Sequence, residues 1–250
     1  MPDIRAIPVE GLAEVRPGDD VPELILHALR SRRRKLKPGD ILVVTHKIVS
    51  KAEGQIVGLG EVKPTASARR WAKRFKLDAR IVQLGHRESR RIVRRRLGVT
   101  ISETRHGFVC ANAGVDASNV DGGRSAVLLP ADPDRSARQM YRKIKSRVGF
   151  AVPVILTDSF GRPWREGLTE VAIGVAGMKA LRDLRGRRDP HGYRLRVTMD
   201  AVADELACLA GLACDKLSRA PACIIRGYPY QPGRGSGRDL IRPAERDLFR

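Results

Sequence analysis

Two aspartates are the first candidates for chemistry, because carboxylates are the minority charge in this chain. Asp158 follows the apolar run 152–157 and precedes Ser159 and a phenylalanine–glycine pair. Open sheets bind ligands where an apolar strand passes into such a glycine-containing loop. A single aspartate at this place can also cap a turn, so the pattern alone leaves both interpretations open.

Asp116 lies within 112–119, a run of small and polar residues that follows an expected strand. The two asparagines and the glycine of this run are typical of an Asx turn. The same oxygen-rich composition suits Mg²⁺ or Mn²⁺, hard cations that take few protein carboxylates and complete their coordination with phosphate oxygens. Turn and metal site are both compatible with these residues.

Lys51 belongs to the segment 50–54, which follows the first buried strand after a short step. A lysine held beyond a strand end can act as a point charge for phosphate. The chain contains neither a P-loop nor a G-x-G-x-x-G fingerprint, and its five histidines show no paired metal spacing. The residues by themselves therefore predict a protein that binds something phosphorylated, with a divalent metal as an option.

The elements that must position these residues follow from apolar patterns. Strands are expected at 41–45, 99–103, 107–111, 126–129, 152–157, 193–199 and 222–226. Helices are expected at about 21–33, 66–76, 88–97, 134–148 and 200–217. Because strands and helices interleave without a strict βαβ rhythm, the pattern favours an α+β fold with a mixed sheet over a doubly wound parallel one.

Length and composition describe an ordinary globular chain of 250 residues, with 42% apolar and 30% charged residues. We expect a single domain over 1–250, with subdomains possible and a loosely held tail at 230–250. No apolar run approaches the roughly 20 residues of a membrane span, and the opening residues lack a secretory pattern. We therefore expect a cytoplasmic protein without membrane contact, whose four cysteines are free thiols.

The charge is extreme: 48 lysines and arginines against 28 acidic residues give +20. Such a field attracts nucleic acid, an anionic membrane or phosphorylated small molecules, and it does not choose among them. Basic residues gather at 30–37, 69–80, 87–96 and 182–188, with only Trp71 and Phe75 available for stacking. We interpret these segments mainly as solvated faces, and a basic nucleic-acid-binding module remains an alternative.

Several segments together resemble the coenzyme F420-0:L-glutamate ligase (gamma-glutamyl ligase) family. The matching stretches are 8–12, 17–20, 39–44, 48–54, 107–120, 129–134, 156–162 and 202–205, in family order across nearly the whole chain. Each stretch is weakly specific alone, whereas the joint match is highly specific.

The resemblance implies a GTP-dependent amide ligase that adds L-glutamate to coenzyme F420-0 and then makes gamma-linked additions. It implies an acyl-phosphate intermediate, Mg²⁺ or Mn²⁺, often K⁺, and an intertwined homodimer of gamma-glutamyl-ligase-like fold. A relative that acts on another acid acceptor is a further alternative, because the segment 213–218 lacks the glycines of archaeal members.

The resemblance also implies roles for individual residues. Nucleotide contacts would come from Leu12, Ala13, Glu14, Val15, His46, Lys47, Lys51 and Asn119. Metal ligands would be Asp116, Asp158, Ser159 and Asp215, the last as a replacement for the family's acidic residue. Lys51, Asp116 and Asp158 would carry the catalysis, since phosphoryl transfer needs positioning and charge neutralisation more than covalent help.

Overall fold

The structure is a computed structural model that describes residues 3–118, 121–215 and 217–247. Its strands are β1 (Arg5–Pro8), β2 (Ile41–Thr45), β3 (Ile56–Gly58), β4 (Ser89–Arg96), β5 (Val99–Thr104), β6 (Val109–Ala111), β7 (Ser125–Val127), β8 (Val154–Arg162), β9 (Arg165–Ala176), β10 (Arg182–Asp183), β11 (Met199–Asp200) and β12 (Ala222–Arg226). Its α-helices are α1 (Val21–Ser31), α2 (His46–Ala52), α3 (Ala66–Phe75), α4 (Ala79–Glu88), α5 (Pro133–Val148) and α6 (Val202–Ala213). Short 3₁₀ turns include η2 (Asn112–Gly114) and η4 (Gly237–Leu240).

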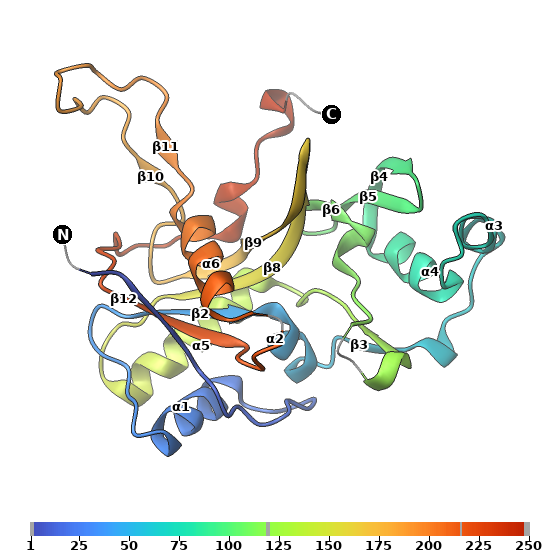
Figure 1. The fold of residues 1–250 in the computed structure, drawn as a ribbon, viewed down its shortest axis with the longest axis horizontal. Helices are drawn as coiled ribbons and strands as arrows, with labels where there is room; N and C mark the ends of the chain where they lie inside the picture. Colours follow the sequence, from blue (N-terminus) through green and yellow to red (C-terminus); the bar gives the residue numbers. More distant parts are fainter. Residues whose placement is uncertain (1–2, 119–120, 216, 248–250) are drawn as a thin grey trace.

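The main sheet has the strand order β1-β12-β2-β8-β9 (Figure 1). β2 and β8 run parallel, and the other neighbouring pairs of this sheet are antiparallel. The expected mixed sheet of an α+β fold is thereby confirmed. Apolar runs at 41–45, 152–157 and 222–226 form its central strands, because a strand covered on both faces needs apolar side chains throughout.

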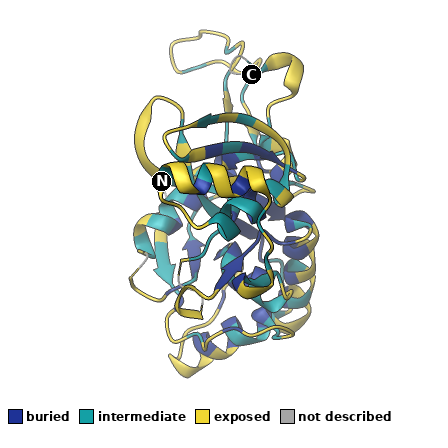
Figure 2. Ribbon diagram, turned by 90° about the vertical axis from the view of Figure 1, so that its right-hand side faces the viewer, coloured by how far each residue is buried: buried dark blue, intermediate teal, exposed yellow. Residues whose placement is uncertain are grey.

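Helices cover both faces of this sheet. In β2, Leu42 and Val44 pack into one buried cluster with side chains from α1 and α5. The alternate residues Ile41 and Val43 pack into a second cluster with α6. Figure 2 shows the result as buried strands between helices whose outer faces are exposed. The two-residue period of the strand thus determines which helix each side chain contacts.

Caps fix where the two helices of the first face begin. The Oδ1 of Asp20 accepts a hydrogen bond from the backbone N of Glu23 at 3.3 Å, at the start of α1. Asp132 accepts from the N of Arg135 at 2.9 Å, and α5 begins with a proline at its first position. Each cap satisfies a backbone N–H that the helix itself leaves unpaired. The two helices begin within one residue of the predicted positions, 21 and 134.

A smaller lobe lies beside the main sheet and contains α3, α4, β3 with β7, and the sheet β4-β5-β6 (Figure 1). Its core is the apolar cluster around Leu59 and Leu84. The expected helix over 88–97 is wrong: a helix occupies Ala79–Glu88, and the following residues form β4. The β-branched pair Ile92–Val93 favours a strand, and pairing with β5 overrides the helical spacing of the arginines.

Two further segments differ from the sequence patterns. The expected strand over 193–199 is wrong, because only Met199 lies in a strand, the short β11, and most of 183–198 forms a projecting arm (Figure 1). Around η4, within the expected loose tail, the chain lies against the main sheet: the N of Gly237 donates to Oδ1 of Asp134 at 2.7 Å, and Asp134 also accepts from Val175 in β9.

No helix among the described residues is long and apolar enough to cross a membrane.

Candidate functional site

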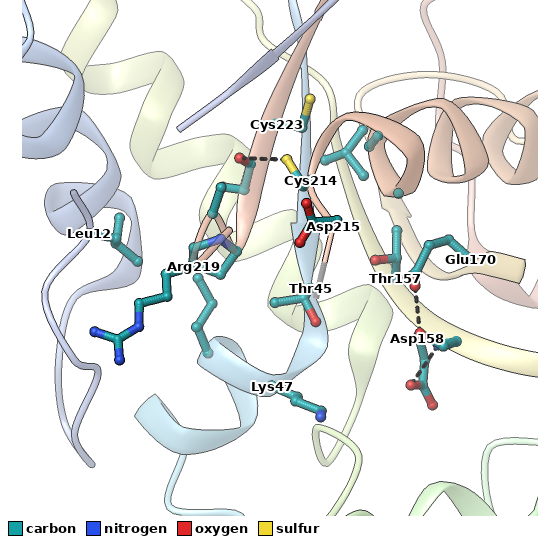
Figure 3. Close-up of a pocket in the computed structure, with 18 of the residues that line it drawn as sticks. Leu12, Thr45, Lys47, Thr157, Asp158, Glu170, Cys214, Asp215, Arg219 and Cys223 are labelled. Atoms are coloured by element: carbon teal, nitrogen blue, oxygen red, sulfur yellow. Dashed lines mark hydrogen bonds between the residues drawn. The ribbon is translucent and has the colours of Figure 1, made fainter. Parts of the chain in front are cut away.

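A cavity of about 930 Å³ opens beside the carboxyl end of β2 (Figure 3). Most of the residues that the sequence analysis singles out line it: Leu12, Ala13, Glu14, Val15, Lys47, Lys51, Asp116, Asp158, Ser159 and Asp215. They come from segments far apart in the sequence, so the fold gathers them.

The register of the main sheet explains why the cavity forms here. Thr45, the last residue of β2, pairs with Thr157 of the parallel strand β8. β2 then turns into α2, whereas β8 continues to Arg162 and pairs only with β9. The expectation that the strand ends at Asp158 is therefore wrong. Asp158 lies within β8, at the crevice that opens where its neighbour β2 stops.

Asp158 is held by its own strand and by α2. Its Oδ1 accepts a hydrogen bond from the backbone N of Ser159 at 2.8 Å. The Nε2 of His46 lies 3.2 Å from the same oxygen, without the geometry of a hydrogen bond. His46 is fully buried, and its Nδ1 lies 3.2 Å from Oγ of Ser50. His46 does not line the cavity, so it contacts Asp158 from the protein interior, on the side away from the cavity.

Asp116 faces the same cavity from the loop before β7. Its backbone pairs with Val127, and its Oδ1 accepts from the N of Ser118 at 2.6 Å. The Nζ of Lys47 lies 2.6 Å from Oδ2. Burial by itself would raise the pKa of Asp116, but the hydrogen bonds from Lys47 and Ser118 outweigh burial and hold that pKa below its ordinary value.

The second lysine of α2 is also paired. The Nζ of Lys51 lies 2.5 Å from Oε1 of Glu14, which belongs to the segment Leu12–Val15. This pair connects α2 to the N-terminal wall of the cavity. Both lysines therefore lie where an anionic ligand could exchange with their carboxylate partners.

Asp215 lines the cavity, but its Oδ1 is engaged by backbone groups of its own loop. It accepts backbone hydrogen bonds from Leu217 at 2.6 Å and Ser218 at 2.9 Å. This is an Asx-type turn that shapes the loop between α6 and β12. Asn119, expected to contact the nucleotide, lies outside the described residues.

The sequence analysis misses several residues of the cavity. Glu170 is one of them, on β9 directly opposite Ser159. Others are Thr45, Thr157, Cys214 and Arg219. The signal for Glu170 is weak, because the long hairpin of β8 and β9 contains an exposed, polar middle without clear alternation.

The donor atoms suit a hard cation. The candidate ligands Asp116, Asp158 and Ser159 offer oxygen only, as Mg²⁺ and Mn²⁺ prefer. Among residues 3–118, 121–215 and 217–247, no group of three or more His, Cys, Asp or Glu side chains is arranged to hold a metal. Such a cation would therefore need phosphate oxygens and water to complete its shell, which is how Mg²⁺ is usually held beside nucleotides.

Comparison with known proteins identifies the family. The family model described as F420-0:gamma-glutamyl ligase matches residues 11–227. A coenzyme F420:L-glutamate ligase of Methanothermobacter thermautotrophicus is 46% identical over 99% of this chain and 99% of its own length. Proteins of the same name from Methanopyrus kandleri and Archaeoglobus fulgidus are 43% and 40% identical, over 100% and 99% of this chain and 99% and 96% of their own lengths. This chain belongs to the F420-0:gamma-glutamyl ligase family of enzymes.

Proposed function

We propose that this enzyme joins the amine of L-glutamate to the carboxylate of coenzyme F420-0 at the expense of GTP, and that it then extends the product through gamma linkages. The names of its relatives support the acceptor and the amino acid. The observation that carries the proposal is that Lys47, Lys51, Asp116 and Asp158 share one cavity with the segment Leu12–Val15.

The mechanism follows from the low reactivity of a carboxylate, which is a poor acyl donor. Transfer of the γ-phosphoryl group would convert the carboxylate of F420-0 into an acyl phosphate, which the glutamate amine attacks with release of phosphate. Lys47 and Lys51 would bind the phosphate oxygens and neutralise their charge, exchanging their present carboxylate partners for the nucleotide. Leu12–Val15 would hold the nucleotide against α2, so that the reacting groups are aligned.

Asp116 and Asp158 would hold the first divalent cation, and Ser159 would lie near a second one, for which Asp215 is a further candidate ligand. When bound, Mg²⁺ or Mn²⁺ would supply positive charge that the transferring phosphoryl group requires. K⁺ and assembly into a homodimer belong to the same proposal, and both rest on the family resemblance.

The direct test incubates the pure protein with F420-0, L-glutamate, GTP and Mn²⁺, and follows the mass of the acceptor. We expect an increment of one glutamyl unit, then further equal steps. Asp116→Asn and Asp158→Asn should each abolish the increment while circular dichroism stays unchanged. Asp183→Asn is the matched control, because Asp183 is an exposed residue at the base of the projecting arm and is not among the residues that line the cavity. Near-normal activity in both cavity variants would refute the site.

The alternative of nucleic-acid binding would use Trp71 and Phe75 to stack on bases, but in the folded chain these two rings contact other side chains. Trp71 and Phe75 pack on each other with ring centroids 4.4 Å apart. The guanidinium of Arg95 lies 5.6 Å from the centre of the Trp71 ring. Both rings are half-buried and already contact neighbours within the small lobe. An enzyme for another acid acceptor would be recognised in the same mass assay, by adducts on a different carboxylic acid.

A further inference from the structure

Glu170 is a carboxylate of the cavity to which neither the sequence nor the proposed mechanism gives a role. It lies on β9, and its Oε1 accepts a hydrogen bond from Oγ of Ser159 at 2.5 Å. Its side chain lines the cavity beside Leu168 of the same hairpin. The hydroxyl of Ser159 thus fixes one carboxylate oxygen of Glu170 and leaves the other for a ligand.

Glu170 differs from the other carboxylates of the cavity in its partners. Glu14 and Asp116 pair with lysines, and Asp215 accepts two backbone N–H groups. Asp158 accepts the backbone N–H of Ser159, and the ring of buried His46 lies 3.2 Å from the same oxygen. Glu170 has only the neutral hydroxyl of Ser159, and in the described parts of the chain no lysine or arginine pairs with it. A carboxylate that is partly withdrawn from water gains most from a cationic partner. The missing cation is therefore expected to come from a ligand.

Helix α6 holds the Glu170 side chain in place. A Cβ atom at Gly211 would lie 2.5 Å from Cγ of Glu170, far inside contact distance. The Sγ of Cys208, one turn earlier, donates to the backbone O of Glu170 at 3.2 Å. The helix thus packs directly on Glu170, and the close approach depends on the absence of a side chain at Gly211.

We propose that Glu170 binds the ammonium group of the amino acid substrate. Figure 3 shows Glu170 and Asp158 on one side of the cavity, with Leu12 and Arg219 on the other. The phosphates of a nucleotide are drawn to the lysines of α2, and a cationic amine is drawn to the unpaired carboxylate on the hairpin side. The inference rests on the proposed function, because it assigns the place of the incoming amino acid in that reaction.

The principal test is Glu170→Gln, which removes the charge and keeps the shape. We expect the KM for L-glutamate to rise by about tenfold or more, as for a lost charged hydrogen bond. The KM for GTP should stay within about twofold of the wild-type value, because the lysine side is untouched. Glu166→Gln is the matched control, since Glu166 is an exposed residue of the same strand. It should leave both KM values unchanged.

A second nucleophile separates amine binding from phosphoryl transfer. Hydroxylamine is largely uncharged at neutral pH, and it captures an acyl phosphate as a hydroxamate. Glu170→Gln should therefore form hydroxamate from F420-0 and GTP at a rate near that of the wild type. A parallel loss of hydroxamate would place Glu170 in the phosphoryl-transfer step and overturn the inference. An unchanged KM for L-glutamate would overturn it as well.

Gly211→Ala is an independent variant that leaves every polar group intact. The new methyl group should push the Glu170 side chain aside and raise the KM for L-glutamate, again by about tenfold. The same substitution should stabilise the isolated helix, because alanine is the better helix former. A lowered affinity in a well-folded variant then reports displacement of Glu170. A wild-type affinity would mean that the position of Glu170 does not matter for binding.

Direct binding distinguishes a failure of this inference from a failure of the proposed function. Calorimetry measures L-glutamate binding to the protein in the presence of a non-hydrolysable GTP analogue, without any acceptor acid. If the wild type binds glutamate and Glu170→Gln does not, the inference holds even if the acceptor is an acid other than F420-0. If both bind glutamate equally, the inference is wrong while ligase activity can still be present.

Discussion

The ammonium group of Lys47 lies 2.6 Å from Oδ2 of Asp116 and so joins α2 to the loop before β7. The same Nζ donates to Oγ of Ser118 at 3.0 Å. A positive charge therefore already lies against the carboxylate that is proposed to hold a metal. Asp116 thus behaves as a site for cations in the folded chain, and Lys47 has to share it or move when a metal nucleotide binds.

Replacing this lysine tests its proposed role. Lys47→Met should raise the KM for GTP by about tenfold, because one phosphate-neutralising charge is lost. Lys47→Arg, which keeps the charge, should recover part of the loss. Steady-state kinetics measures both effects, with Lys63→Met as a control at an exposed lysine. An unchanged KM for GTP in Lys47→Met would remove Lys47 from the nucleotide site.

The four cysteines should differ in reactivity. Burial, aided by the charge of Asp158, raises the pKa of Cys110 to about 12. A hydrogen bond with Cys223 lowers the pKa of Cys214, even though partial burial acts in the opposite direction. Because the thiolate is the reactive form, iodoacetamide should label Cys214 first and leave Cys110 unlabelled.

Cys214 also lines the cavity, so a bound nucleotide should slow its labelling. Peptide mass spectrometry after short exposures, with and without GTP and Mg²⁺, measures the order and the protection. Equal labelling of Cys214 and Cys110 would contradict the difference in their surroundings. If GTP does not change the rate at which Cys214 is labelled, the result would argue against nucleotide binding in this cavity.

The sequence predicts the parts of the fold in which local and tertiary preferences agree. The runs 41–45 and 222–226 are apolar throughout, so they predict the buried strands β2 and β12 directly. The segment 88–97 is different, because its arginines have helical spacing while pairing with β5 makes it a strand. Such an outcome depends on a partner strand that local patterns do not reveal.

The residues of the candidate site can likewise be predicted from the sequence only in part. Asp116 and Asp158 are noticeable in the sequence as carboxylates among many basic residues, but their shared cavity depends on the register of β2 and β8. Glu170 has only a weak signal in the sequence, since the pairing of β9 with β8 is what brings it opposite Ser159. Residue types can thus be anticipated, whereas the contacts that give them chemistry arise from strand pairing.

Arg226 should be important for stability, because it neutralises a buried carboxylate. Its Nε and Nη2 bind Oδ1 and Oδ2 of Asp40 at 2.7 and 2.8 Å, and Asp40 is fully buried. Arg226→Met would leave that carboxylate without its cation. We expect a loss of about 3 kcal/mol in the free energy of unfolding.

Urea denaturation measures this loss, and Arg234→Met at an exposed position is the control. The double variant Arg226→Met/Asp40→Asn should recover part of the stability, because it removes the buried charge itself. If the single variant is as stable as the wild type, the ion pair contributes nothing and water must reach Asp40.

Asp204 gives the fold a pH dependence of unusual sign. Burial raises the pKa of Asp204, although its carboxylate accepts a hydrogen bond from the backbone N of Ala172 at 2.8 Å. A raised pKa means that the folded protein binds the proton more tightly than the unfolded chain. The corresponding stability is present below the unfolded pKa of about 3.9 and is lost as the pH rises through the folded pKa.

Asp204→Asn removes this dependence while its amide oxygen can still accept from Ala172. The variant should match the wild type near pH 3 and become more stable than the wild type towards neutral pH. Urea denaturation at a series of pH values measures the difference. Asp183→Asn serves as a control for which the opposite pH dependence of stability is expected, because Arg185 lowers the pKa of Asp183 to about 2. A difference between Asp204→Asn and the wild type that does not change with pH would show that Asp204 is not protonated more readily in the folded state.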